Sequence, residues 1–292
     1  MTVIASASRM PEGMNLEVRN IKFELSEQLS KDWLDNDPFK TAFFNALSMT
    51  FPDGERFFID SVRHYKDEVK DPKLKKEMSG FFGQEGMRSR EHLTYNKALC
   101  DLRGYSQEKM EGRTKKMVRL GQKKMSPVGH LAATCGVEHI TAIFADKVLN
   151  GWMLSEVDPQ MRSLWEWHSA EELEHKSVAF DVYIDIGGNY KARKLTLRMF
   201  TIHFLWNLLA NTAYMLRKDK KLWKWSTLKS GFRFLFGRGG VLREFRSDYL
   251  MYFDPDFHPW DDDNRHLLEN WQAPQKAWMV SLLPGGRVVR TK

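Results

Sequence analysis

Three polar side chains share one stripe of a predicted helix near the middle of the chain. His168, Glu172 and His175 are separated by four and three residues, and such positions lie on one face of an α-helix. The stripe is apolar on either side of them, at Leu164 and Val182. A carboxylate buried between two imidazoles needs a compensating charge, which a metal ion supplies. The alternative is the solvated face of a charged helix.

Three other predicted helices offer matching donors. Glu55 lies on the apolar face of a short helix, and Glu138 interrupts an otherwise apolar stripe. Glu85 and His92 are seven residues apart, which places them two helical turns apart on one face. Each residue alone is more often structural than functional. Their occurrence on several helices together favours a shared metal site.

The donor pattern is close to that of the di-iron and di-manganese carboxylate bundles. Those bundles take one Glu from each of two helices and a Glu-x-x-His pair from each of the other two. Glu55 and Glu138 supply the first two carboxylates, and Glu172 with His175 forms one of the pairs. If the site holds two iron ions that react with O2, Glu138 and either Glu85 or Glu172 would bridge them.

The second Glu-x-x-His pair is incomplete, because Arg88 stands three residues after Glu85. A guanidinium has no lone pair to offer a metal. We therefore expect His92 to take the missing place, and Arg88 to hold a carboxylate or to bind an anionic substrate group. The predicted ligands are Glu55, Glu85, His92, Glu138, His168, Glu172 and His175. Four carboxylates and three imidazoles favour two iron ions, or manganese, over a structural zinc.

The elements that must carry these residues are almost all predicted helices. Asp-Pro and Ser-Pro pairs mark the starts of these helices, and glycines mark several of their ends. The expected helices cover 37–49, 53–66 with Asp53 as its N-cap, 71–103, 106–124, 126–150 and 158–187. Residues 15–25 alternate as a strand would, and the tail from Gln272 onward is expected to be poorly ordered. His64 and His139 point away from the site faces.

Composition bounds the class of protein. The chain has 292 residues, 42% of them apolar, which excludes disorder and collagen-like structure. Its two cysteines, Cys100 and Cys135, exclude a disulfide scaffold and favour a reducing cytosol. No signal peptide is expected.

The C-terminal third differs from the rest in charge. Residues 189–246 hold fourteen Lys and Arg against two acidic residues, a local charge of +12. Residues 199–216 contain no Asp, Glu, Lys or Arg, but His203, Asn207 and Asn211 would be costly in lipid. Basic residues interleaved with aromatic ones favour an anchor on an anionic membrane surface; the alternative is a core helix with a basic surface loop. Nucleic acid is not expected, because no recognition module accompanies the charge.

Three segments carry a resemblance to a known family. They are Phe51-Pro-Asp-Gly-Glu-Arg-Phe-Phe58, Gly83-Gln-Glu-Gly86 with His92 and Asn96 beyond it, and Glu174-His-Lys-Ser-Val-Ala-Phe-Asp181. Over roughly residues 15–270 the chain resembles the bacterial predicted metal-dependent hydrolases, a family assigned to the ferritin-like superfamily. In that family the position of Arg88 is often histidine. The His168–His175 run is also similar to the third-histidine variant of arylamine N-oxygenases in that superfamily.

Together these observations predict an all-α protein with a ferritin-like four-helix bundle, an extra N-terminal segment and a helical C-terminal extension. We expect a division into residues 1–188, with the lead-in and the metal-binding bundle, and 189–292, the basic extension packed on it. The favoured function is O2-dependent oxidation or oxygenation of an apolar or lipid-like substrate at a di-iron centre, with an electron donor as partner. The alternatives are hydrolysis by a metal-activated water and a non-catalytic metal-binding bundle. The expected location is the cytoplasm, peripherally on the inner face of the membrane.

Overall fold

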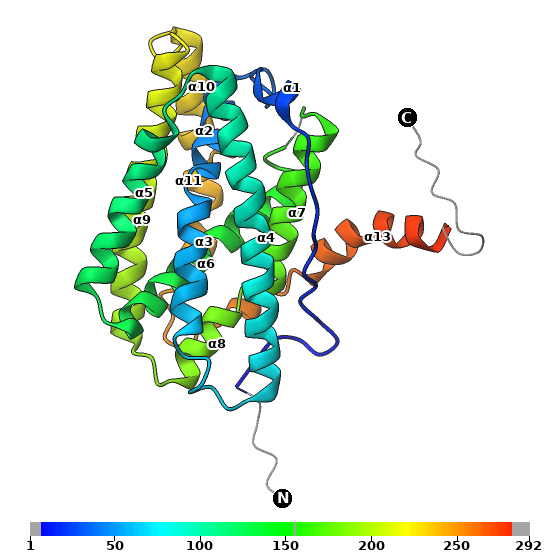
Figure 1. Cartoon of the computed structure of the whole chain (residues 1–292), viewed down its shortest axis with the longest axis vertical. Helices are drawn as coiled ribbons and strands as arrows, with labels where there is room; N and C mark the ends of the chain where they lie inside the picture. The colour runs from blue at the N-terminus through cyan, green and yellow to red at the C-terminus, as the bar shows by residue number, and fades with distance from the viewer. Residues whose placement is uncertain (1–6, 155, 282–292) are drawn as a thin grey trace, which may run out of the picture.

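The protein is built from helices (Figure 1). The computed structural model describes residues 7–154 and 156–281, and within this range there is no β-strand, only one isolated bridge between Leu34 and Val157. The elements are α1 (Ser26–Leu29), α2 (Pro38–Ser48), α3 (Phe51–Arg63), α4 (Pro72–Arg103), α5 (Gln107–Lys124), α6 (Pro127–Leu149), α7 (Pro159–His175), α8 (Val178–Asp185), α9 (Tyr190–Lys218), α10 (Trp225–Phe236), α11 (Val241–Glu244), α12 (Arg246–Met251), the 3-10 turn η1 (Pro259–Asp261) and α13 (Arg265–Ser281). The all-α prediction is confirmed.

Asp-Pro and Ser-Pro pairs start four of the long helices, as predicted. In α2, α4, α6 and α7 a proline occupies the first turn, and the preceding Asp or Ser side chain accepts hydrogen bonds from backbone N–H groups of that turn. Gly104 ends α4 with a φ of 64°, a left-handed conformation that glycine adopts without strain. These local signals fix where the site-bearing helices begin.

The predicted strand at residues 15–25 is wrong. This segment is extended but pairs with no strand, and Figure 1 shows it running alongside α4. Leu16 and Val18 pack onto Gly80 and Gly83, where an added Cβ would lie 2.5 and 2.4 Å from their side-chain atoms. The Gln84 amide donates to the Glu17 carbonyl. This backbone group is therefore satisfied by a side chain of α4 and not by a neighbouring β-strand. The alternating pattern reflects packing on a helix.

Two helix boundaries also differ from the prediction. Asp53 is not an N-cap: α3 begins at Phe51, and Asp53 lies in its first turn. The expected helix over 158–187 is two helices, because the helical conformation is interrupted at Lys176 and Ser177. There the Ser177 hydroxyl donates to the Asp181 carboxylate, a local bond that competes with the helical pattern.

The expected disorder from Gln272 onward is wrong for residues 272–281, which belong to α13. Residues 282–292 lie outside the described residues. The division of the chain at residue 188 stays a prediction.

Four helices surround the predicted site. α3 packs on α4, α6 packs on α7, and the contacts α3–α6 and α4–α7 close the ring. This arrangement is what a four-helix bundle requires, and the ferritin-like assignment remains a prediction.

α9 covers the outside of this ring. It packs against α2, α5 and α6. Gly136 of α6 allows the close approach, because a Cβ there would lie 3.0 Å from Leu197 Cα. Asn207 donates to Thr114 and Asn211 accepts from Arg113, so two of the three polar residues of the uncharged stretch bond to α5, whereas His203 is exposed.

Among the described helices, α6 is the one long and apolar enough to span a membrane by length and composition. Within its most apolar window, 61% of the residues are buried inside the protein, and the helix carries Glu138. α6 is therefore best understood as a core helix of the bundle.

Candidate metal centre

The predicted ligands come together at the centre of the ring. Each of the seven, and Arg88 as well, has at most 3% of its surface exposed. The solvated-face alternative for the His168–His175 run is therefore wrong. Burial of so many ionisable groups is costly unless they are paired or bind a cation.

One donor group consists of Glu55, His92 and His168. One candidate ligand atom from each lies within 4.8 Å of the others. Phe51 covers this group, with ring centroids 4.7 Å from His92 and 4.3 Å from His168. α3, α4 and α7 each contribute one donor.

The hydrogen bonds around His92 define its tautomer. The Ser48 hydroxyl donates to Asn96 Oδ1 at 2.7 Å and lies 2.9 Å from His92 Nδ1, so it accepts from that nitrogen. His92 Nε2 then accepts from His168 Nδ1 at 2.9 Å. This leaves His168 Nε2 with a lone pair. For His92 to bind a metal, its Nε2 must give up the hydrogen bond to His168 Nδ1 and bind the ion instead. Ligation by His92 stays a prediction.

The other donor group consists of Glu85, Glu138 and His175, again within 4.8 Å. His175 Nε2 lies 3.3 Å from Glu85 Oε1 and 3.4 Å from Glu138 Oε2. Glu85 and His92 are both buried on α4, seven residues apart. Because they are two turns apart on a regular α4, these side chains fall into different groups.

Glu172 and Arg88 lie between the two groups. Glu172 Oε1 is 3.3 Å from His168 Nε2, and its Oε2 is 3.7 Å from His175 Nε2. Arg88 pairs with Glu85 and lies 3.0 Å from Glu172 and 3.6 Å from Glu55. A carboxylate in this position can reach both donor groups.

The sequence interpretation missed Glu171. It is fully buried, accepts from Trp167 Nε1 at 2.9 Å, and lies 3.7 Å from Arg88. Its signal was its position three residues after His168, which places it on the edge of the same helical stripe. Gln84, one position before Glu85, was missed as well; it holds His175 Nδ1 at 2.8 Å.

Several buried donor atoms have no hydrogen-bond partner. They include both carboxylate oxygens of Glu55 and of Glu138, Glu85 Oε2 and His175 Nε2. Unpartnered buried polar atoms are rare in folded proteins. These atoms belong to the two donor groups, so the residues present fit a pair of metal ions.

The charges of the buried side chains also fit a pair of metal ions. Six buried carboxylates, those of Glu55, Glu85, Glu138, Glu171, Glu172 and Glu174, face two guanidiniums, those of Arg88 and Arg19. With neutral histidines the ionised cluster carries a net charge of −4, which two divalent cations neutralise and one does not.

Without metal, burial changes the protonation of the cluster. It raises the pKa of Glu138 to about 8 and that of Glu171 to about 7, and it raises the pKa of Glu55 well above its usual range. Burial alone would lower the pKa of His175, but the carboxylates of Glu138, Glu172 and Glu85 around its Nε2 favour the protonated form and raise this pKa well above its usual value. Metal binding at neutral pH must therefore release protons.

These shifts predict a pH dependence of the metal-free protein. A carboxyl group whose folded-state pKa is raised stabilises the fold below its unfolded pKa, and this contribution is lost as pH rises through the folded value. The stabilising contribution of Glu138 is lost as the pH rises through about 8, and that of Glu171 as the pH rises through about 7. We expect the melting temperature of the metal-free protein to fall from pH 7 to pH 9, and the stabilisation by Fe(II) or Mn(II) to increase over the same range. A metal-induced stabilisation that shrinks with rising pH would contradict this.

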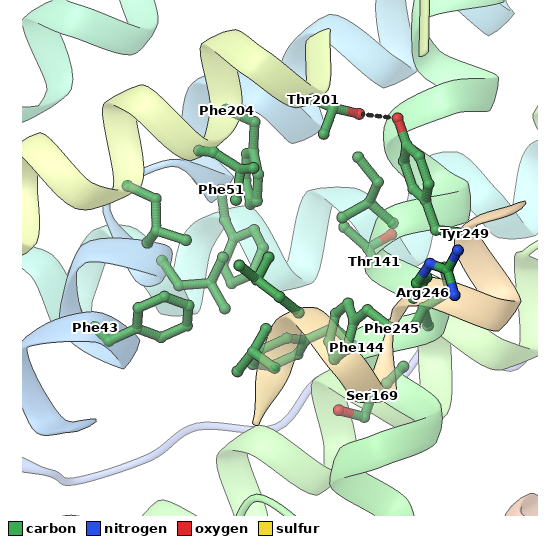
Figure 2. Close-up of a pocket in the computed structure, with 18 of the residues that line it drawn as sticks. Phe43, Phe51, Thr141, Phe144, Ser169, Thr201, Phe204, Phe245, Arg246 and Tyr249 are labelled. Carbon is green, nitrogen blue, oxygen red and sulfur yellow. Dashed lines mark hydrogen bonds between the residues drawn. The ribbon is translucent and has the colours of Figure 1, made fainter. Parts of the chain in front are cut away.

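A hydrophobic cavity of about 240 Å³ (Figure 2) adjoins the first donor group, because His168 is one of the residues that line it. His168 and Thr141 form its inner wall, and Thr141 donates to Glu172 Oε2 at 2.6 Å. Aromatic and aliphatic side chains form most of the rest, from α2, α6, α9, α11 and α12. The Ser169 hydroxyl also lines it and is buried without a hydrogen-bond partner among the described residues. The cavity suits an apolar substrate with one polar group.

The histidines assigned to other roles lie outside the cluster. His64 is exposed, as expected. His139 is bonded to the Asp248 carbonyl at 3.0 Å and packs on Tyr252, and burial lowers its pKa to about 4.

A buried centre of carboxylates and imidazoles inside a ring of helices defines the class as a helical metal-binding protein. Residues 17–263 match a family described as predicted metal-dependent hydrolases, so the chain belongs to that family. No curated protein matches the chain, and no solved structure matches it.

Proposed function

We propose that this chain is a dinuclear-metal enzyme that oxidises an apolar substrate with O2, using iron. One observation carries the proposal: two groups of carboxylate and imidazole donors have unpartnered ligand atoms, and the group that contains His168 adjoins an apolar cavity. Carboxylate- and histidine-rich sites in helical bundles suit redox-active iron. An oxygenation would also need an external electron donor.

The protein positions the ligands through a second layer of hydrogen bonds. Gln84 Nε2 donates to the Glu17 carbonyl and to Glu174 Oε2, so its Oε1 accepts from His175 Nδ1. His175 Nε2 is thereby aimed at Glu85 and Glu138. When bound, the metal pair supplies the electrons and the Lewis acidity that activate O2.

The substrate-binding part of the proposal rests on the cavity wall. Apolar side chains exclude water next to His168, and the Thr141 hydroxyl bridges the cavity and the Glu172 carboxylate. The Ser169 hydroxyl, which has no hydrogen-bond partner among the described residues, offers the substrate a polar contact. Such a wall favours a long or bulky apolar molecule over a sugar or a nucleotide.

Hydrolysis by a metal-activated water is the second candidate, and the family description supports it. A metal pair can lower the pKa of a bound water and stabilise the attacking and leaving oxygens. The same donor groups would hold the ions.

The two reactions are separated by loading the protein anaerobically with Fe(II) and measuring O2 uptake after mixing with air-saturated buffer. We expect uptake that scales with bound iron and disappears in Glu138→Gln. A parallel sample loaded with Zn(II) or Mn(II) is mixed with p-nitrophenyl octanoate. Metal-dependent ester hydrolysis without O2 uptake would overturn the oxidation proposal in favour of hydrolysis.

A further inference from the structure

α9 and α10 follow one another through a short loop and both pack on α2, and together (the α9–α10 hairpin) they expose apolar side chains with no protein partner in the described residues. On α9 these are residues spaced by three and four, which lie on one side of the helix: Leu195, Met199, Ile202, Trp206 and Leu209. The loop and α10 add five more exposed apolar residues, Trp223, Trp225, Leu228, Phe232 and Phe236. Trp206, Trp223 and Trp225 are 73%, 82% and 77% exposed. Exposed apolar patches of this kind mark interaction sites.

Exposed basic side chains belong to the same segment of the chain as these apolar residues. Of the fourteen Lys and Arg in residues 189–246, eleven are exposed. Of the two acidic residues there, Asp219 already accepts from Arg103 and Tyr105. The exposed surface of this segment is therefore strongly positive, which disfavours pairing with a second copy of itself and favours an anionic surface.

The cavity beside the metal centre opens next to the same hairpin. Leu242 and Arg246 line the cavity and are exposed, Leu242 by 43%. Leu205 of α9 also lines the cavity, and it is the neighbour in sequence of exposed Trp206. α9 thus contributes both exposed apolar side chains and part of the cavity wall.

We propose that the α9–α10 hairpin docks the protein on an anionic lipid bilayer, with its tryptophans at the headgroup level and the cavity entrance facing the lipid. Large aromatic residues flanked by Lys and Arg suit the membrane–water interface. The supply of an apolar substrate from the bilayer rests on the proposed function; the docking itself does not.

The test is co-sedimentation of the full chain with vesicles, carried out without metal so that it is independent of any activity. We expect binding to phosphatidylcholine vesicles containing phosphatidylglycerol, little binding to pure phosphatidylcholine, and release by high salt. Each exposed basic residue near such a surface contributes about a fivefold change in partition coefficient. The variant Lys218→Glu, Lys224→Glu, Lys229→Glu should therefore bind at least about 100-fold more weakly.

Matched variants keep the result interpretable. Lys66→Glu, Lys70→Glu, Lys75→Glu changes the same charge on exposed positions away from the hairpin and should bind as wild type does. Trp223→Ala with Trp225→Ala should weaken binding, whereas Leu102→Ala with Leu120→Ala, also exposed, should not. Equal recovery in the supernatant with every vesicle, or self-association of the chain without vesicle binding, would overturn the proposal.

Discussion

Replacing Glu138 by Gln is expected to remove most of the bound metal and, at the same time, to raise the melting temperature of the metal-free protein at pH 8–9. The carboxylate is a ligand in the second donor group, but without metal it is buried beside other carboxylates and its pKa is raised to about 8. Gln keeps the shape and removes the charge, which relieves a cost on the order of 2 kcal/mol or more. Metal content by mass spectrometry and melting by calorimetry give the two readouts.

The controls for this variant use residues outside the cluster. Glu111→Gln also changes a buried helical glutamate, one paired with Lys115, and should leave metal content unchanged. His175→Ala should remove metal as Glu138→Gln does, whereas His64→Ala should not. Two ions per chain in either site variant would contradict the assignment of these ligands.

Replacing Arg88 by Gln is expected to destabilise the metal-free protein severely. Arg88 is fully buried and contacts four buried carboxylates of the cluster, whereas the guanidinium of Arg19 reaches only one of those four, Glu171. Removing one partner of a buried ion pair typically costs about 3–5 kcal/mol. Metal ions neutralise the same carboxylates, so the metal-loaded variant should lose much less stability than the metal-free one.

Arg103→Gln is the matched control for Arg88→Gln. Arg103 is mostly buried and bridges Asp32 and Asp219, far along α4 from the metal centre. Its loss should lower the unfolding temperature of the loaded and metal-free forms by similar amounts. A similar, metal-independent loss in Arg88→Gln would mean that Arg88 does not share its carboxylates with metal.

Much of the candidate site follows from helical periodicity. A polar residue inside an apolar stripe, such as Glu138, must be buried once the helix packs, and the structure buries it. The helix starts at Asp71-Pro72 and Ser126-Pro127 were predictable because a cap and a proline act locally.

Periodicity does not say how far apart two residues lie across the bundle. His92 therefore joined Glu55 and His168 from other helices, although it shares a face with Glu85. The central place of Arg88 and the burial of Glu171 depend on how α3, α4 and α7 pack together. The segment at residues 15–25 was misread for a similar reason, because an alternating pattern can serve packing on Gly80 and Gly83 as well as a sheet.

The most direct test of the dinuclear centre is native mass spectrometry of the anaerobically purified chain during titration with Fe(II). We expect the spectrum to move from the metal-free chain to a species with two ions, and the Glu138→Gln chain to stop short of it. Two results would contradict a metal pair held by these two donor groups. One is saturation of the wild-type chain at one ion, and the other is the absence of Fe(II) binding by both the wild-type chain and the Glu111→Gln control.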